Sequence, residues 1–194
     1  MYGAFMQIYL RGDNDWRQRT PWEEAQARGV PEALLAVEGV DIVAGQMADG
    51  RVRVASATGQ GTISWRNGCG SYAFRGVDPL GCGSFDDLED EAILRLSFNS
   101  THPDAPQQLS QIFRAERSGD IMVSAKRGYD LRARWEIPEH RSTHGALVPA
   151  QMHVPVIIGA PVAANNFRTA DVFPTVLRLM GREPAEGIDG VARD

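Results

Sequence analysis

The sequence predicts an α/β fold: a layered, mostly parallel sheet with flanking helices. Predicted strands alternate with predicted helices along most of the 194 residues, which is the pattern of a sheet whose strands are connected by helices. Residues 154–158, Val-Pro-Val-Ile-Ile, form an unbroken apolar run, as expected of a strand that helices cover on both faces. Closely spaced turn sequences add a small antiparallel β meander over residues 45–80. The length fits a single domain over residues 1–194.

The N-terminal residues predict a strand followed by helices. Residues 4–10, Ala-Phe-Met-Gln-Ile-Tyr-Leu, are apolar, and neither a basic segment nor a cleavage site accompanies them. They therefore differ from a signal peptide, and we expect a cytoplasmic protein if the chain is complete as given. Residues 20–23, Thr-Pro-Trp-Glu, have the spacing of a helix start with a capping box. A short helix over residues 31–37 and a strand over residues 40–44 are expected next.

Three turn sequences divide residues 45–80 into short strands. Asp49-Gly50 and Asn67-Gly68 are strong signals for hairpin turns, and a glycine pair at residues 59–61 predicts a turn between them. Residues 51–56 alternate polar and apolar side chains, as in a strand with one buried face. The segment is therefore expected to form an antiparallel meander that is an excursion from the main sheet.

The second half of the chain predicts helices and one further strand before the apolar run. A helix is expected over residues 85–96, whose early acidic side chains favour a helix N-terminus, and another over residues 106–115. A strand is expected over residues 120–125. Thr169 is expected to cap a last helix, which Gly181 ends.

The composition argues against some classes of partner. With 20 Lys and Arg against 25 Asp and Glu, the net charge of -5 disfavours nucleic acid as the main partner, because phosphate binding needs clustered basic side chains. No apolar run reaches the roughly 18 residues of a membrane-spanning helix. Cys69 and Cys82 fit two unpaired thiols, a disulfide in an oxidising compartment, or half of a metal site. Unpaired thiols are favoured over metal because no further ligands are patterned nearby.

Several segments occur in an order that resembles a known family. A histidine turn at residues 142–145, Ser-Thr-His-Gly, precedes the apolar run. Further matching segments are Val77–Gly81, Arg117–Ala125, Gly128–Asp130, Glu139–Leu147, Met152–Pro155, Arg168–Asp171, Pro174–Gly181 and Gly187–Gly190. Together they resemble the C-terminal end of the alkaline phosphatase superfamily, in its type I phosphodiesterase/nucleotide pyrophosphatase-like branch. The similarity covers nearly the whole chain and is most specific over residues 117–190.

The resemblance implies a metal-dependent hydrolase acting on a small phosphoester. Members of this superfamily hold two zinc ions about 4 Å apart, and a Ser or Thr nucleophile attacks phosphorus. Their metal ligands come from an N-terminal Asp, an Asp-x-x-x-His pair, an Asp-His pair and a late His-Gly turn. Only the last of these maps onto this chain, at His144, and His140 is a candidate to support a metal ligand. Phosphomonoester, phosphodiester, sulfate and phosphonate substrates all stay open.

The rest of the family's site has no counterpart in the sequence. No aspartate is followed directly by histidine or has a histidine four places on, and the nucleophile segment is missing, so no catalytic residue is assigned. The chain resembles the C-terminal portion of an enzyme, from a truncated gene or one that needs an N-terminal half or partner chain. Alone, it is expected to be inactive and to bind no zinc tightly. The alternative is a non-catalytic binding or interaction domain that retains the fold.

A metal site built locally around the histidine turn is disfavoured. Glu136, His140 and His144 have the spacing of residues on one helix face. However, Pro138 lies between them, and a proline in a helix interior costs about 3 kcal/mol. The three side chains are therefore not expected to form a site on a helix.

The remaining polar candidates are interpreted as structural. Ser142 and Thr143 lack a base that a third group orients, so they are interpreted as turn residues. His102, beside a proline, is expected to face solvent in a loop, and His153 is expected to support the strand that follows it. Asp171 is expected to be a charge in the first turn of the last helix.

Overall fold

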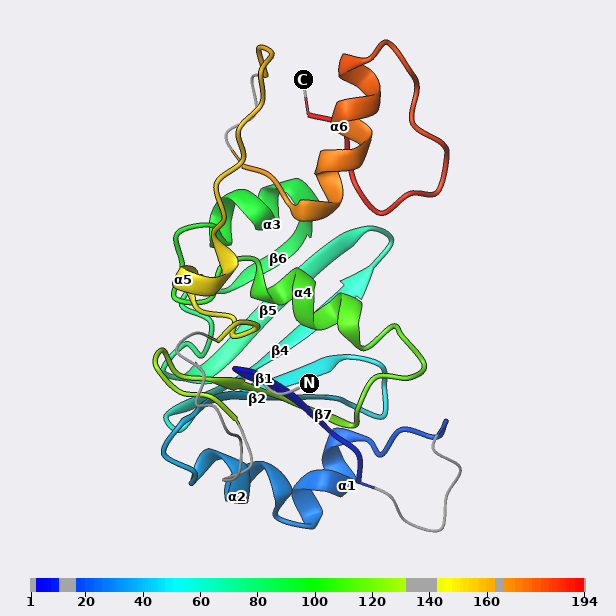
Figure 1. The fold of residues 1–194 in the computed structure, drawn as a ribbon. Coiled ribbons are helices and arrows are strands. Elements are labelled where there is room, and N and C mark those ends of the chain that lie inside the picture. Colours follow the sequence, from blue (N-terminus) through cyan, green and yellow to red (C-terminus); the bar gives the residue numbers. More distant parts are fainter. Residues whose placement is uncertain (1–2, 11–16, 132–142, 163–165, 194) are drawn as a thin grey trace. The chain divides into compact units, whose positions relative to one another are not determined.

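The structure, a computed structural model, describes residues 3–10, 17–131, 143–162 and 166–193. The chain divides into two compact units, Met1–His153 and Val154–Asp194. The described strands all belong to the first unit, where they form one sheet (Figure 1). They are β1 (Phe5–Ile8), β2 (Val40–Gln46), β3 (Val52–Ala55), β4 (Gly59–Arg66), β5 (Cys69–Gly76), β6 (Phe85–Glu89) and β7 (Ile121–Ala125).

Every neighbouring pair of strands in this sheet is antiparallel, in the order β1-β7-β2-β3-β4-β5-β6. The predicted mostly parallel α/β sheet is therefore wrong. Strands β2 to β5 follow one another through short turns, and such connections can only reverse the chain direction. Strand β7 enters between β1 and β2, with Ser124 opposite Phe5 on one side and Val123 opposite Val43 on the other.

Helices cover both faces of the central strands. The described helices of the first unit are α1 (Trp22–Ala27), α2 (Val30–Leu35), α3 (Asp90–Ser97), α4 (Ala105–Ile112) and α5 (Pro149–Met152). Helices α1 and α2 lie on one face of the sheet and α4 on the other (Figure 1). All five residues of β7 are buried. An unbroken buried run thus occurs in an antiparallel sheet, because helix cover, and not strand direction, decides burial.

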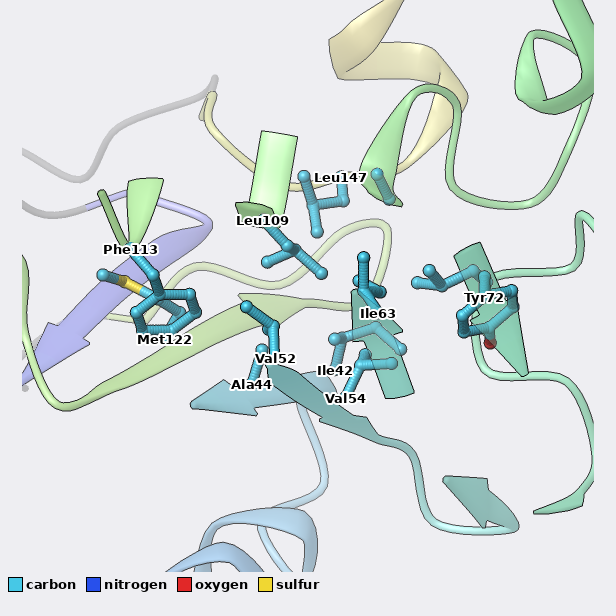
Figure 2. Close-up of a cluster of buried hydrophobic side chains, with 12 residues drawn as sticks. Ile42, Ala44, Val52, Val54, Ile63, Tyr72, Leu109, Phe113, Met122 and Leu147 are labelled. Atoms are coloured by element: carbon cyan, nitrogen blue, oxygen red, sulfur yellow. The ribbon is translucent and has the colours of Figure 1, made fainter. Parts of the chain in front are cut away.

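Each face of the sheet has its own hydrophobic core. Figure 2 shows the larger one, in which side chains of the sheet pack against Leu109 of α4 and Phe113, the residue that follows α4. Tyr72 of β5 is among its largest fully buried side chains. On the opposite face, Trp22 of α1 packs in a second cluster with Val43 and other apolar residues of β2 and β7. The two cores fix both helix layers on the sheet.

Two of the three turns predicted between residues 45 and 80, at Asp49-Gly50 and Asn67-Gly68, are present, whereas residues 59–61, where the third was predicted, lie within β4. Gly50 has a φ of 86° in the β2–β3 connection. Asn67 and Gly68 have φ values of 51° and 85° between β4 and β5, as the two central residues of a type I′ hairpin require. These hairpins are part of the one continuous sheet, so the meander is not an excursion from a parallel one.

The predicted helix over residues 85–96 is correct only in its second part. Phe85–Glu89 is the edge strand β6, and the helix α3 begins at Asp90. Strand β6 pairs with β5, where Ser71 Oγ donates to Asp86 and accepts a hydrogen bond from the backbone N–H of Asp87. Cross-strand contacts of this kind override local helix preference.

The second unit contains the 3-10 helix η1 (Thr169–Asp171) and the helix α6 (Val172–Leu179) among its described residues. Residues 154–158 belong to no helix or strand, and Ile157 is 94% exposed. The predicted buried strand is therefore wrong. A strand needs a hydrogen-bonded neighbour, and none of the described strands pairs with this segment.

The buried carboxylate of Asp171 stabilises the second unit through hydrogen bonds to its C-terminal segment. It accepts hydrogen bonds from the backbone N–H groups of Arg168 and Val191 and from Nε of Arg193. A Cβ on Gly190 would lie 2.0 Å from the carbonyl oxygen of Ala170, so only glycine permits this close approach. The C-terminal segment is thereby fixed against the start of α6.

Candidate functional site

His144 lies on a turn that contacts the start of β1, and its side chain is exposed. Its carbonyl oxygen accepts a 2.9 Å hydrogen bond from the backbone N–H of Ala4. A Cβ on Gly3 would come within 2.7 Å of the same oxygen, and Gly145 has a φ of 101°. The close approach therefore depends on these glycines. The backbone of the turn is fixed against β1, whereas the imidazole is open to solvent.

Of the residues considered for a metal site from the sequence around the histidine turn, only His144 lies among the described residues. No interaction of the His144 imidazole is found in the described part of the chain, which also contains no group of three or more His, Cys, Asp or Glu that could hold a metal ion. His140 and Glu136 lie outside the described residues. A catalytic zinc takes three protein ligands. The described part of the chain therefore does not fit a zinc centre by itself.

Thr143, the neighbour of His144, does not have the contacts of an activated hydroxyl. Its Oγ1 atom is buried and has no hydrogen-bond partner. A nucleophile needs a base within hydrogen-bond reach. Ser142 lies outside the described residues. The histidine turn thus presents one exposed imidazole and no nucleophile among the residues that the structure describes.

A second polar arrangement is the loop over residues 78–83, which the carboxylate of Asp78 organises. Its Oδ1 accepts hydrogen bonds from the phenol of Tyr72 at 2.6 Å and from the backbone N–H of Leu80 at 3.0 Å. Its Oδ2 accepts a 2.7 Å hydrogen bond from the N–H of Gly83. Burial alone would raise the pKa of Asp78, but these hydrogen bonds outweigh it and hold the pKa below its usual value.

The two cysteines are free thiols. Burial, followed by the charge of Asp78, raises the pKa of the Cys82 thiol to about 12. Burial also raises the pKa of Cys69, with smaller contributions from Asp87 and Glu89. A reactive cysteine has a lowered pKa, so neither thiol has the environment of a nucleophile.

A third arrangement joins the loop after α3 to the sheet. Nε2 of His102 lies 3.0 Å from Oδ2 of Asp41, and its Nδ1 lies 3.1 Å from Oγ1 of Thr101. Thr101 Oγ1 also donates to the carbonyl oxygen of Leu80 at 3.0 Å. His102 is only 6% exposed, so the prediction of a solvent-facing loop histidine is wrong. Both of its ring nitrogens have partners.

The same loop contains unusual backbone and polar features. Asp104 has a φ of 56°, a conformation that side-chain-bearing residues rarely adopt. Ser100 Oγ and Gln107 Oε1 are buried without a hydrogen-bond partner, and both residues are more than nine-tenths buried. Most buried polar atoms in proteins have a partner. Strain and unpaired polar atoms therefore occur together around His102.

Two other candidates have structural contacts. The ring of His153 stacks on Phe98 with 4.5 Å between centroids, and its Nε2 is 2.9 Å from the Phe98 carbonyl oxygen. This contact supports a structural interpretation, although the expected strand after His153 does not form. Asp171 lies at the start of the last helix, as predicted, but it is 2% exposed and pairs with Arg193.

A scan against protein-family models found no match, and searches of curated proteins and of solved structures found none either. No helix within the described residues is long and apolar enough to cross a membrane. The similarity to the alkaline phosphatase superfamily therefore stays a prediction from sequence motifs.

Sequence reasoning missed the arrangement around His102. Asp41 is 61 residues away from His102 in the chain, and no local spacing relates the two. The only sequence signal was the adjacency of Thr101 and His102, which occurs by chance in many chains. The pairing depends on the fold, because β2 and the loop after α3 come together only in the tertiary structure.

Proposed function

We propose that this chain is the C-terminal part of a metal-dependent phosphoester hydrolase and that His144 is one ligand of its zinc centre. The observation that supports the proposal is the presentation of His144. Its imidazole is exposed and without a partner in the described residues, while the hydrogen bond from Ala4 and the close approach at Gly3 fix the backbone of the turn. A metal ligand needs a ring nitrogen that is free to coordinate the ion, and the exposed imidazole of His144 offers one.

The remaining ligands and the nucleophile would come from another segment or a partner chain. Zinc bound there would polarise the phosphoryl oxygens and activate the nucleophile. The described part of this chain would contribute the position of one imidazole. Alone, the chain is expected to bind zinc weakly and to hydrolyse no phosphoester.

The test uses p-nitrophenyl phosphate and bis-p-nitrophenyl phosphate with the chain alone and added zinc. We expect no turnover above buffer, together with weak zinc binding that shifts the NMR signals of the His144 ring and disappears in His144→Ala. His153→Ala is the matched control and should leave zinc binding unchanged. Turnover that is lost in His144→Ala would contradict the inactivity of the isolated chain. Zinc shifts that persist in His144→Ala would contradict the role of His144.

A binding or interaction domain is the second candidate, because the second unit exposes many apolar side chains. Of the fourteen large apolar side chains that are exposed in the described residues, nine belong to residues 154–193. Five of them are on or next to α6: Val172, Phe173, Val176, Leu179 and Met180. Exposed apolar patches mark interaction sites. A monodisperse protein that melts cooperatively without metal would favour this function, and an aggregating one would count against it.

A further inference from the structure

We propose that Thr101 is a nucleophile that attacks small carboxylic esters, with His102 as its general base and Asp41 as a positioning residue. The Thr101 hydroxyl lies 3.1 Å from Nδ1 of His102, and the other ring nitrogen of His102 lies 3.0 Å from the carboxylate of Asp41. A hydroxyl, an imidazole within hydrogen-bond reach and a third group that orients the imidazole form the arrangement that activates a nucleophile.

Asp41 determines which ring nitrogen acts as the base. An ionised carboxylate only accepts hydrogen bonds, so it keeps the proton of the neutral imidazole on Nε2. The lone pair of Nδ1 then faces the hydroxyl of Thr101. The carbonyl oxygen of Leu80, which also lies near this hydroxyl, has a second donor in the backbone N–H of His102 at 3.3 Å. The hydroxyl can therefore turn to Nδ1 without leaving that carbonyl unpaired.

The burial of the three groups matches their proposed roles. Thr101 is an exposed residue, and the hydrogen bonds of its hydroxyl to Leu80 and His102 are partly buried. His102 is 6% exposed, and the side chain of Asp41 is 27% exposed. Partial removal from water strengthens the interaction between imidazole and carboxylate. The proposed nucleophile thus belongs to an exposed residue next to a shielded base.

The loop over residues 78–83 holds the hydroxyl from one side. A Cβ on Gly81 would lie 2.3 Å from Oγ1 of Thr101, so the close contact requires glycine at this position. Asp78 fixes the loop through the backbone N–H groups of Leu80 and Gly83. Asp104 has a left-handed backbone, and Ser100 Oγ and Gln107 Oε1 are buried without a partner. Features of this kind cluster at functional sites.

The reaction is a two-step acyl transfer. Oγ1 of Thr101 bonds to the carbonyl carbon while its proton passes to Nδ1 of His102. The bond to the alcohol breaks, and the alcohol leaves with that proton, so an acyl ester forms on Thr101. Water then attacks the acyl carbon as Nδ1 takes the water proton, and the carboxylic acid leaves while Thr101 regains its hydroxyl. No oxidant, reductant or metal takes part.

The test follows hydrolysis of p-nitrophenyl acetate by the full chain in the presence of EDTA. Acid-quenched samples are digested, and the acetylated residue is identified by mass spectrometry. We expect hydrolysis above the buffer rate, with acetyl groups on Thr101. Thr101→Val should abolish both, whereas Thr58→Val, which removes another exposed threonine hydroxyl, should change neither. Because zinc is chelated, failure of this test would not bear on the role proposed for His144.

Two further variants separate the base from the positioning residue. His102→Gln should lower kcat about a hundredfold or more, the usual contribution of a general base. Asp41→Asn should lower kcat with KM unchanged. Asparagine no longer fixes the proton of the His102 ring on Nε2, but it leaves the surface around Thr101 intact. Circular dichroism checks that each variant is folded. An equal rate in wild type and Thr101→Val, acetylation at another residue, or full activity in His102→Gln would overturn the proposal.

Discussion

The phenol of Tyr72 donates a 2.6 Å hydrogen bond to the carboxylate of Asp78. This bond joins the buried centre of β5 to the loop over residues 78–83, and Tyr72 is only 1% exposed. The loop in turn contacts Thr101 through Leu80 and Gly81. A contact made in the core of the sheet thereby positions the surface loop that contacts the proposed nucleophile, Thr101.

Tyr72→Phe is expected to lower the free energy of unfolding by about 1.5–3 kcal/mol, because it leaves a partly buried carboxylate without its hydroxyl donor. Urea unfolding followed by circular dichroism measures the change. Tyr129→Phe is the control, because it removes another tyrosine hydroxyl, which bonds an exposed Glu38, and it should cost less than 1 kcal/mol. Equal losses in both variants would contradict a special role for the Tyr72 bond.

Stability should fall at alkaline pH through Tyr72. Burial, followed by the hydrogen bond and charge of Asp78, raises the pKa of Tyr72 above its ordinary value. Its contribution is therefore complete below the unfolded pKa of about 10 and is lost as pH rises toward the folded value. Urea midpoints between pH 8 and pH 11 should decline more steeply in wild type than in Tyr72→Phe. Parallel declines would exclude Tyr72 as the cause.

Cys82 should react slowly with alkylating reagents in the folded protein. Its pKa of about 12 leaves little thiolate near pH 8, so iodoacetamide should react on the order of a thousandfold more slowly than with an unperturbed thiol. Cys69→Ser isolates the signal of Cys82, and the same variant in urea supplies the unperturbed rate. Fast alkylation in the folded state would show that the thiol is not shielded.

The second unit should depend on the buried pair formed by Asp171 and Arg193. The side chains lie 2.8 Å apart and are 3% and 7% exposed, and breaking such a pair costs about 3–5 kcal/mol. Asp171→Asn should therefore speed hydrogen exchange at the amides of Val191 and Arg193. Arg178→Ala, which breaks an exposed pair with Glu183, should cost about 0–1 kcal/mol. Unchanged exchange in Asp171→Asn would mean that the pair does not hold the C-terminal segment.

The position of His144 should depend on Gly3. A methyl group on Gly3 would meet the His144 carbonyl oxygen at 2.7 Å, and overpacking of this kind costs about 1–3 kcal/mol. Gly3→Ala should lower stability and shift the NMR signals of the His144 backbone. Gly159→Ala is the matched control, since no atom lies within 4 Å of the added Cβ. Equal effects of the two substitutions would contradict the close contact at Gly3.

Local sequence patterns located several elements of the first unit correctly. The strands near residues 40–44 and 120–125 and the helix near residues 106–115 are present, as are the turns at Asp49-Gly50 and Asn67-Gly68. These features depend on neighbouring residues, because the alternation of side chains and the residues that adopt a left-handed turn are determined within short segments of the sequence.

Local patterns failed where a distant partner decides the outcome. Residues 85–89 form a strand because β5 lies beside them, whereas Val154, Val156 and Ile157 remain exposed and no described strand pairs with their segment. His102 is buried because Asp41 and Leu80 meet it from other parts of the chain. The spacing of residues along the sequence does not predict hydrogen-bond partners that lie this far apart in the chain.

The sequence by itself determined the positions of turns, several strands and the histidine turn that carries His144. The tertiary structure alone decided that β7 enters the sheet antiparallel between β1 and β2, since these strands come from distant parts of the chain. It alone brought Thr101, His102 and Asp41 together. The physical reason is that turn and strand preferences are local, whereas strand direction and polar clusters arise from hydrogen bonds and burial between distant segments.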